Sequence, residues 1–140
     1  MTHIARRRWS LGNAKRAEEA YRSALLINRN LPVHNPDAAY DYVEFLKAQS
    51  SSAEAQQLLQ EILQWTPLFA PGRVELARQL AQRAEWPRVI EEGELALQLA
   101  DDDMGIRRSA HATLARAYAA IGQLKKANLH QRWIEQESVK

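Results

Sequence analysis

A repeat with a period of 34 to 38 residues constrains the fold of this 140-residue chain more than any other feature of its sequence. Small or modest-sized residues recur in a fixed frame, with steps of 38, 34 and 38 residues, at Ala17, Ala55, Val89 and Ala127. Thirteen residues before each stands an apolar residue followed by a smaller one: Ile4-Ala5, Tyr42-Val43, Leu76-Ala77 and Leu114-Ala115. Five residues before each stands an expected turn position: Gly12, Ser50, Ala84 and Gly122. Such a frame predicts a stack of similar units, each covering the apolar face of the next.

The units are expected to be helical, because no segment alternates with the period of two that a half-buried strand requires. Asn35-Pro36 and Trp86-Pro87 each place a proline in the first turn of a helix, and Asp103 is expected to cap another helix. We therefore expect eight helices, near residues 2–11, 14–29, 36–49, 53–65, 70–83, 86–100, 104–121 and 124–136. Paired into hairpins, they give one all-α domain over residues 1–140, with units 1–31, 36–67, 70–101 and 104–136.

Side-chain size within the frame predicts how the hairpins pack. Gly12 and Gly122 suit the left-handed conformation that ends a helix. Gly93 and Gln131 occupy positions where the frame favours a bulky side chain. The residues expected in the core are Tyr21, Tyr42, Leu46, Leu59, Ile62, Leu76, Leu80, Leu114 and Tyr118.

Two of the units carry the most complete motifs. The fourth reads Leu114-Ala115-x2-Tyr118, Gly122 and Ala127, and the second reads Tyr42-Val43-x2-Leu46, Ala55-x3-Leu59 and Pro67. These motifs resemble those of the tetratricopeptide repeat (TPR) family, in which W-x2-L-G-x2-Y is followed by A-x3-F and a late proline. The resemblance covers nearly the whole chain. It implies a right-handed superhelical stack of about four hairpins that binds another molecule and catalyses no reaction.

The same resemblance implies a binding surface. In this family the first helices of successive hairpins line a concave groove. The groove residues of this chain would be Arg6, Trp9, Tyr40, Glu44, Lys47, Val74, Arg78, Gln82 and Arg116. They mix aromatic, basic and amide groups, which suits a peptide or protein segment. Glu44 stands where members that bind a C-terminal carboxylate have an asparagine, so recognition of such a tail is disfavoured.

No residue pattern indicates catalysis, a metal or a cofactor, and we expect none of them. The four histidines have no metal-binding spacing, and His111 is expected to be a packing residue. The acidic run at residues 101–103 lacks the alternate spacing and the glycine of a calcium loop. The sequence has no glycine-rich phosphate loop and no cysteine.

Charge is segregated along the chain, although the net charge is only +2. Residues 1–34 carry a net charge of +5, residues 35–103 carry −8, and residues 104–140 carry +5. The basic cluster Arg6-Arg7-Arg8-Trp9 could neutralise phosphates and stack a base. Nucleic-acid binding is nevertheless disfavoured, because the cluster has no recognition element and the middle of the chain is acidic.

The leading functional hypothesis is a non-catalytic scaffold or adaptor that binds a protein or peptide partner in the groove. An alternative is a self-associating structural element, a homo-oligomer in which Leu129 and Trp133 contact another subunit. In the competing arrangement of the C-terminal helix, Trp133 folds back onto the stack. A further alternative is a regulatory TPR fragment of a larger enzyme or transport machine. No apolar run is long enough for a membrane span and no secretory signal is recognisable, so a cytoplasmic location is expected.

Overall fold

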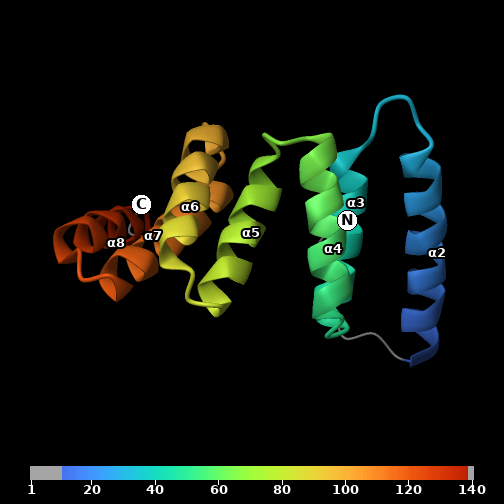
Figure 1. Cartoon of the computed structure of the whole chain (residues 1–140), viewed down its shortest axis with the longest axis horizontal. Helices are drawn as coiled ribbons and strands as arrows, with labels where there is room; N and C mark the ends of the chain where they lie inside the picture. Colours follow the sequence, from blue (N-terminus) through green and yellow to red (C-terminus); the bar gives the residue numbers. More distant parts are fainter. Residues whose placement is uncertain (1–10, 139–140) are drawn as a thin grey trace. The chain divides into compact units, whose positions relative to one another are not determined.

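The computed structural model describes residues 11–138, which form seven α-helices and no strand (Figure 1). This confirms the all-α class. The helices are α2 (Leu11–Arg29), α3 (Pro36–Ala48), α4 (Ser52–Trp65), α5 (Ala70–Gln82), α6 (Trp86–Ala100), α7 (Met104–Ala120) and α8 (Leu124–Ser138). Each corresponds to a segment that the sequence predicts as helical. Of the helix expected near 2–11, residues 2–10 lie outside the described residues and Leu11 belongs to α2.

The chain divides into two compact units, residues 1–67 and residues 68–140. The described part of the first unit contains α2, α3 and α4, and the second contains α5 to α8. The boundary after Pro67 falls between the second and third predicted repeats, so it leaves each of those repeats whole.

Three helix-to-helix turns share one backbone conformation. The residue that ends each turn has a positive φ: Ser50 (61°), Ala84 (57°) and Gly122 (81°). In each case the next backbone N–H donates to the carbonyl five residues earlier, from Ser51 to Leu46, Glu85 to Leu80 and Gln123 to Tyr118. This is the hydrogen bond of a left-handed helix end. These are three of the four turn positions that the frame predicts, so the hairpins α3–α4, α5–α6 and α7–α8 repeat in structure as well as in sequence.

The fourth predicted turn, at Gly12, is wrong. Gly12 lies inside the first turn of α2, and the glycine with a positive φ is Gly122. A Cβ built on Gly12 would meet no heavy atom within 4 Å. A side chain could therefore be accommodated at this position, and α2 begins at Leu11, before the glycine.

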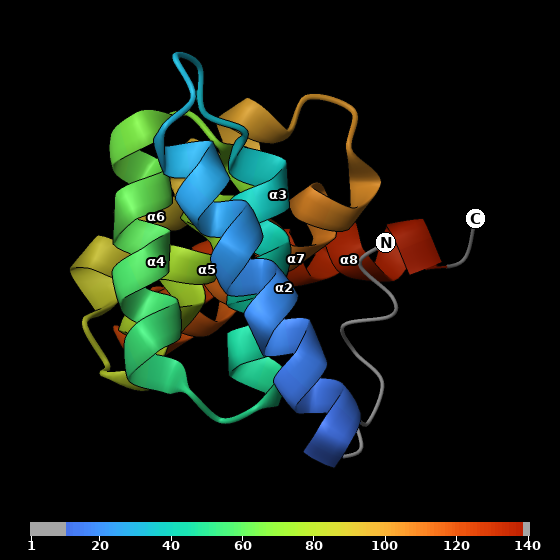
Figure 2. The ribbon, with the colours of Figure 1, turned by 90° about the vertical axis from the view of Figure 1, so that its right-hand side faces the viewer.

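In the first unit, α3 packs against both α2 and α4 (Figure 2). The Tyr21 ring of α2 stacks on Tyr42 of α3 with 5.2 Å between the ring centroids. Leu59 and Ile62 of α4 are fully buried. Asn28 fixes the loop into α3, since its side chain accepts from the Asn35 N–H and donates to the Asn35 carbonyl, both at 2.7 Å. Asn35 caps α3 by accepting from the Ala38 N–H.

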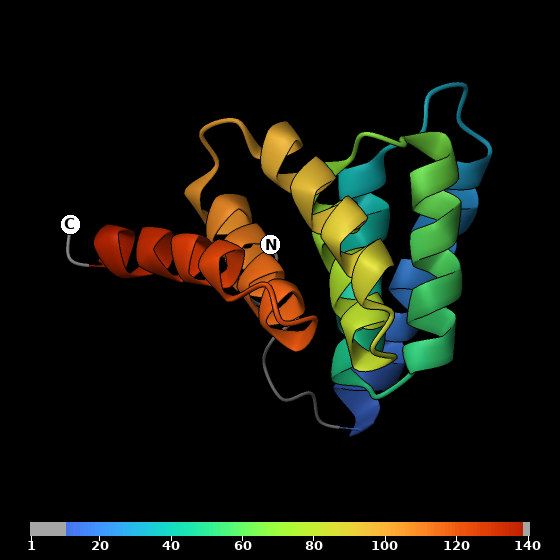
Figure 3. The same ribbon diagram turned by 60° about the vertical axis from the view of Figure 1, so that its left-hand side comes forward.

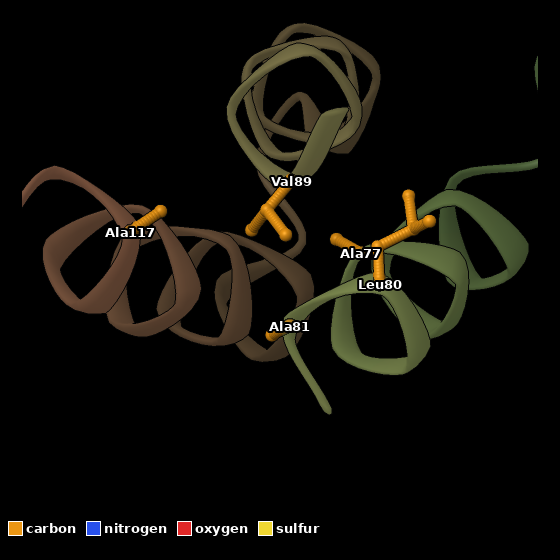
Figure 4. Packing of buried hydrophobic residues seen from close by; sticks show 5 residues of the cluster. All are labelled: Ala77, Leu80, Ala81, Val89 and Ala117. Carbon is orange, nitrogen blue, oxygen red and sulfur yellow. The ribbon is translucent and has the colours of Figure 1, made fainter. Parts of the chain in front are cut away.

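In the second unit, each helix packs on the next, and α5 also contacts α7 (Figure 3). One core cluster joins α5, α6 and α7 (Figure 4) and contains Ala77, Leu80, Ala81, Val89 and Ala117. Mostly small residues in this cluster allow the three helices to approach closely. Of the nine residues expected in the core, seven are buried, and Tyr21 and Leu76 are half-buried.

Gly93 has a packing role that the frame does not anticipate. It lies on α6, and a Cβ built there would be 2.8 Å from Cδ2 of Leu114 on α7. Leu114 therefore occupies the space that a bulky residue at position 93 was expected to fill. The missing side chain allows α7 to pack tightly against α6.

Candidate functional site

Three of the predicted groove residues lie together in the second unit. Arg78 and Gln82 come from α5 and Arg116 comes from α7. With Ala81, Ala112 and Thr113 they line an open cavity of about 300 Å³. We call this cavity the α5/α7 groove. Residues 78 and 82 are one helical turn apart, so a single face of α5 supplies both polar side chains.

Arg78 is held in place by two partners. Its Nη1 donates to Oε1 of Glu75 at 3.2 Å and its Nη2 donates to Oγ of Ser109 at 3.0 Å. Glu75 is only 3% exposed, whereas the side chain of Arg78 is 44% exposed. A buried carboxylate on α5 and a hydroxyl on α7 thus orient a guanidinium group that still reaches the surface.

Arg116 lies over an aromatic ring. The central carbon of its guanidinium group is 5.4 Å from the centroid of the Trp86 ring, which lies at the start of α6. A cation at this distance is attracted to the face of the ring. Trp86 therefore positions Arg116 beside the groove.

Val74 does not belong to the groove, and its assignment there is wrong. It is 4% exposed and packs in a core cluster with Ala96 of α6 and Ala110 of α7. Val74 and Arg78 are one turn apart on the same side of α5. At Val74 that side is covered by α6 and α7, whereas at Arg78 it reaches the surface.

The remaining groove candidates lie in the first unit or outside the described residues. Tyr40 and Glu44 are half-buried on α3, and Lys47, on the same helix, forms an ion pair with Glu44 at 3.7 Å. Arg6 and Trp9 lie outside the described residues.

A second cavity, of about 490 Å³, lies in the first unit between α2 and α4, and the sequence did not suggest it. Its lining includes buried Leu25, Tyr42, Leu46 and Leu58. Arg29 of α2 pairs with Glu61 of α4 at 2.7 Å, and Arg22 lies 3.9 Å from Glu54. The spacing in the sequence is compatible with these two pairs between helices. Arg22 and Arg29 are seven residues apart, and so are Glu54 and Glu61.

The fourth hairpin contains a pair of histidines in contact, of which His111 is buried and His130 half-buried. Nδ1 of His111 on α7 lies 2.8 Å from Nδ1 of His130 on α8. His111 is 7% exposed, as expected of a packing residue, and stacks on Trp133 with 4.2 Å between the ring centroids. Burial, His130 and the Arg107 guanidinium lower the pKa of His111 to about 4. Burial also lowers the pKa of His130, against the opposing effect of Glu94.

Trp133 therefore packs inward, which is the folded-back arrangement considered from the sequence. The guanidinium of Arg107 lies 5.6 Å from its ring centroid. Leu129 is 61% exposed, so the two residues do not form an outward pair. Leu124, at the start of α8, is 62% exposed, and the other exposed residues of this helix are polar.

The acidic run at residues 101–103 has a structural role through Asp103. Its Oδ1 accepts from the Ile106 N–H at 3.1 Å and caps α7, as predicted. Among residues 11–138 no three His, Asp or Glu side chains gather in a way that could hold a metal ion. No helix within this range is both long and apolar enough to cross a bilayer.

The chain matches no protein-family model, no curated protein sequence and no solved structure.

Proposed function

We propose that this chain is a non-catalytic adaptor that binds a peptide or protein segment in the α5/α7 groove. The observation that carries the proposal is the convergence of Arg78, Gln82 and Arg116, from two helices, on one open cavity. The repeated turn conformation supports a TPR-like hairpin stack, for which we propose the right-handed superhelical arrangement of that family and a cytoplasmic location.

The lining of the groove suits an extended polypeptide. The side chains of Ala81 and Ala112 are small, so the backbone of a bound peptide can approach the surface of the groove closely. Gln82 offers both a donor and an acceptor to backbone amides, and Arg78 and Arg116 offer charged donors. A few directed polar groups around small apolar residues are typical of peptide grooves.

A groove-filling variant tests the proposal. Peptides are selected from a random display library on the wild-type protein, and their affinities are measured by fluorescence anisotropy. Ala112→Trp places an indole in the groove and should abolish binding. Ala120→Trp is the matched control, because Ala120 is also exposed on α7 but does not line the groove. Peptides that bind both variants equally well would show that the groove is not the binding site.

Self-association is the second candidate, and the exposure of Leu129 favours it. A single large apolar side chain on a polar helix face is a small contact, and single exposed hydrophobic residues are common. Size-exclusion chromatography with light scattering decides between the two functions. An oligomer that Leu129→Ser converts to a monomer would favour assembly, whereas a monomeric wild type would rule it out.

A further inference from the structure

The α5/α7 groove is positively charged. The described residues that line it include two arginines and no carboxylate. Glu75 lies beside Arg78 but is buried and does not line the cavity. The lining therefore presents positive charge, which would repel a basic segment and attract an acidic one.

Arg78 retains hydrogen-bonding capacity for a ligand. A guanidinium group carries five N–H donors, and the bonds to Glu75 and Ser109 use one donor on each terminal nitrogen. These two bonds fix the orientation of the group before any ligand arrives. A pre-oriented guanidinium loses little side-chain entropy when it binds a carboxylate.

Arg116 offers a second cationic group. It makes no ion pair with a described residue, and its guanidinium group lies over the face of Trp86. A guanidinium that stacks on a ring keeps its N–H donors at the edge, where a carboxylate can bind two of them in parallel. The two arginines come from different helices and share one cavity with Ala81 and Ala112.

We propose that the α5/α7 groove recognises an acidic peptide segment. Carboxylates of two acidic side chains bind Arg78 and Arg116, and the backbone between them lies over Ala81 and Ala112. This inference rests on the proposed function and adds the chemistry of the partner. A peptide is favoured over a nucleic acid because the lining offers no exposed aromatic face on which a base could stack.

The test compares three labelled probes by fluorescence anisotropy at low and high salt. The first is a peptide of alternating Glu and Ala, the second is its Gln–Ala counterpart, and the third is single-stranded oligo-dT. Each is titrated with the wild-type protein and with Arg116→Glu, Arg132→Glu and Ala112→Trp. Arg132 is exposed on α8, so its substitution makes the same change in net charge away from the groove. Arg78 is left unchanged because its removal would leave buried Glu75 without this partner.

The Glu–Ala peptide should bind more tightly than the other two probes, and increasingly so as salt is lowered. Arg116→Glu should weaken its binding by about tenfold, the loss expected when a charge-assisted pair is replaced by repulsion. Arg132→Glu should change it by less than about twofold, as exposed charges outside an interface do.

The other outcomes overturn the inference in different ways. Equal weakening by Arg116→Glu and Arg132→Glu would mean general attraction by net charge, and tightest binding of oligo-dT would mean a nucleic-acid site. Equal binding of the two peptides, abolished in both cases by Ala112→Trp, would overturn the acidic specificity but leave the proposed function standing. If Ala112→Trp affects binding of neither these peptides nor those selected by display, both proposals are wrong.

Discussion

Nδ1 of His111 and Nδ1 of His130 lie 2.8 Å apart, so one of these two atoms donates a hydrogen bond to the other. Glu94 lies 3.9 Å from Nε2 of His130 and favours a proton there. Nδ1 of His130 is then the acceptor and Nδ1 of His111 the donor. In this tautomer Nε2 of His111 carries a lone pair and no proton, and this buried atom has no hydrogen-bond partner among the described residues. The pair is thus arranged for two neutral rings.

Stability is expected to fall as the solution is acidified. The folded-state pKa of His111 lies near 4, below its ordinary value of 6.5, so the unfolded chain binds more protons between these values. The stabilisation is complete above about pH 6.5 and is lost as the pH falls towards 4, by at most about 1.4 kcal/mol per pH unit for this group. Urea unfolding at a series of pH values measures it.

The matched variant is His111→Phe, which keeps a flat ring against Trp133 and removes the titrating group. It should be less stable than the wild type at neutral pH because Nδ1 of His130 loses its partner. Its stability should depend less steeply on pH between 6.5 and 4. Equal slopes for the two proteins would show that other groups control the acid response. Arg107 lies near His111, and Lys126 lies over the Tyr118 ring that stacks on His130, so their positive charges belong to the comparison.

Adding one methyl group to α6 should disturb its contact with α7. In Gly93→Ala the new Cβ would be 2.8 Å from Cδ2 of fully buried Leu114. Overpacking typically costs about 1–3 kcal/mol and alanine restores about 1 kcal/mol of helix propensity, so we expect a net loss of about 1 kcal/mol. Gly12→Ala is the control, since its Cβ meets nothing within 4 Å and should be neutral or stabilising. Urea midpoints that rise for both variants would contradict the close approach.

The core of the second unit should be sensitive to truncation at Leu80. This side chain is 1% exposed and packs with Ala77 and Val89. Leu80→Ala should lower the free energy of unfolding by about 2–5 kcal/mol, through lost burial and the cavity that remains. Leu129→Ala makes the same change at an exposed position and should stay within about 0.5 kcal/mol of the wild type. Similar losses for both would argue against the burial of Leu80.

Removing the cap of α7 should destabilise the fold modestly. Asp103→Ala deletes the carboxylate that accepts from the Ile106 N–H, which should cost about 1 kcal/mol. Asp102→Ala removes a neighbouring exposed charge without touching the cap and should have a smaller effect. Thermal unfolding of the two variants compares them directly. A larger loss for Asp102→Ala would point to another role for the acidic run.

The repeat frame predicted the features that depend on local sequence, namely helix starts and turns. Helix starts followed from Asn35, Asp103 and the early prolines, and three turn positions followed from the period of the repeat. Arg78, Gln82 and Arg116, which the resemblance assigns to one groove, line a common cavity, because one helical turn on α5 and an outward position on α7 place them together. Val74 was misplaced because it lies on the same side of α5 as Arg78, and spacing along one helix does not show where neighbouring helices cover that side.

Specific contacts between helices could not be predicted from the sequence. His111 and His130 are separated by a turn, and only the packing of α7 on α8 brings their rings together. Gly93 was interpreted as a position that lacks an expected bulky side chain, because Leu114, the residue that occupies this space, comes from another helix. The cavity between α2 and α4 depends on how far apart two helices lie, which neither helix encodes alone.

That cavity also has a consequence for how the first unit moves. Contacts with α3, such as the Tyr21–Tyr42 stack, and the arginine–glutamate pairs that reach α4 hold α2 in place. Ring stacks and ion pairs next to a cavity can break in local fluctuations that leave the rest of the unit folded. The amide hydrogens of α2 should therefore exchange with solvent faster than those of α3 and α4. Because salt screens the exposed pairs, higher ionic strength should widen the difference in exchange rate.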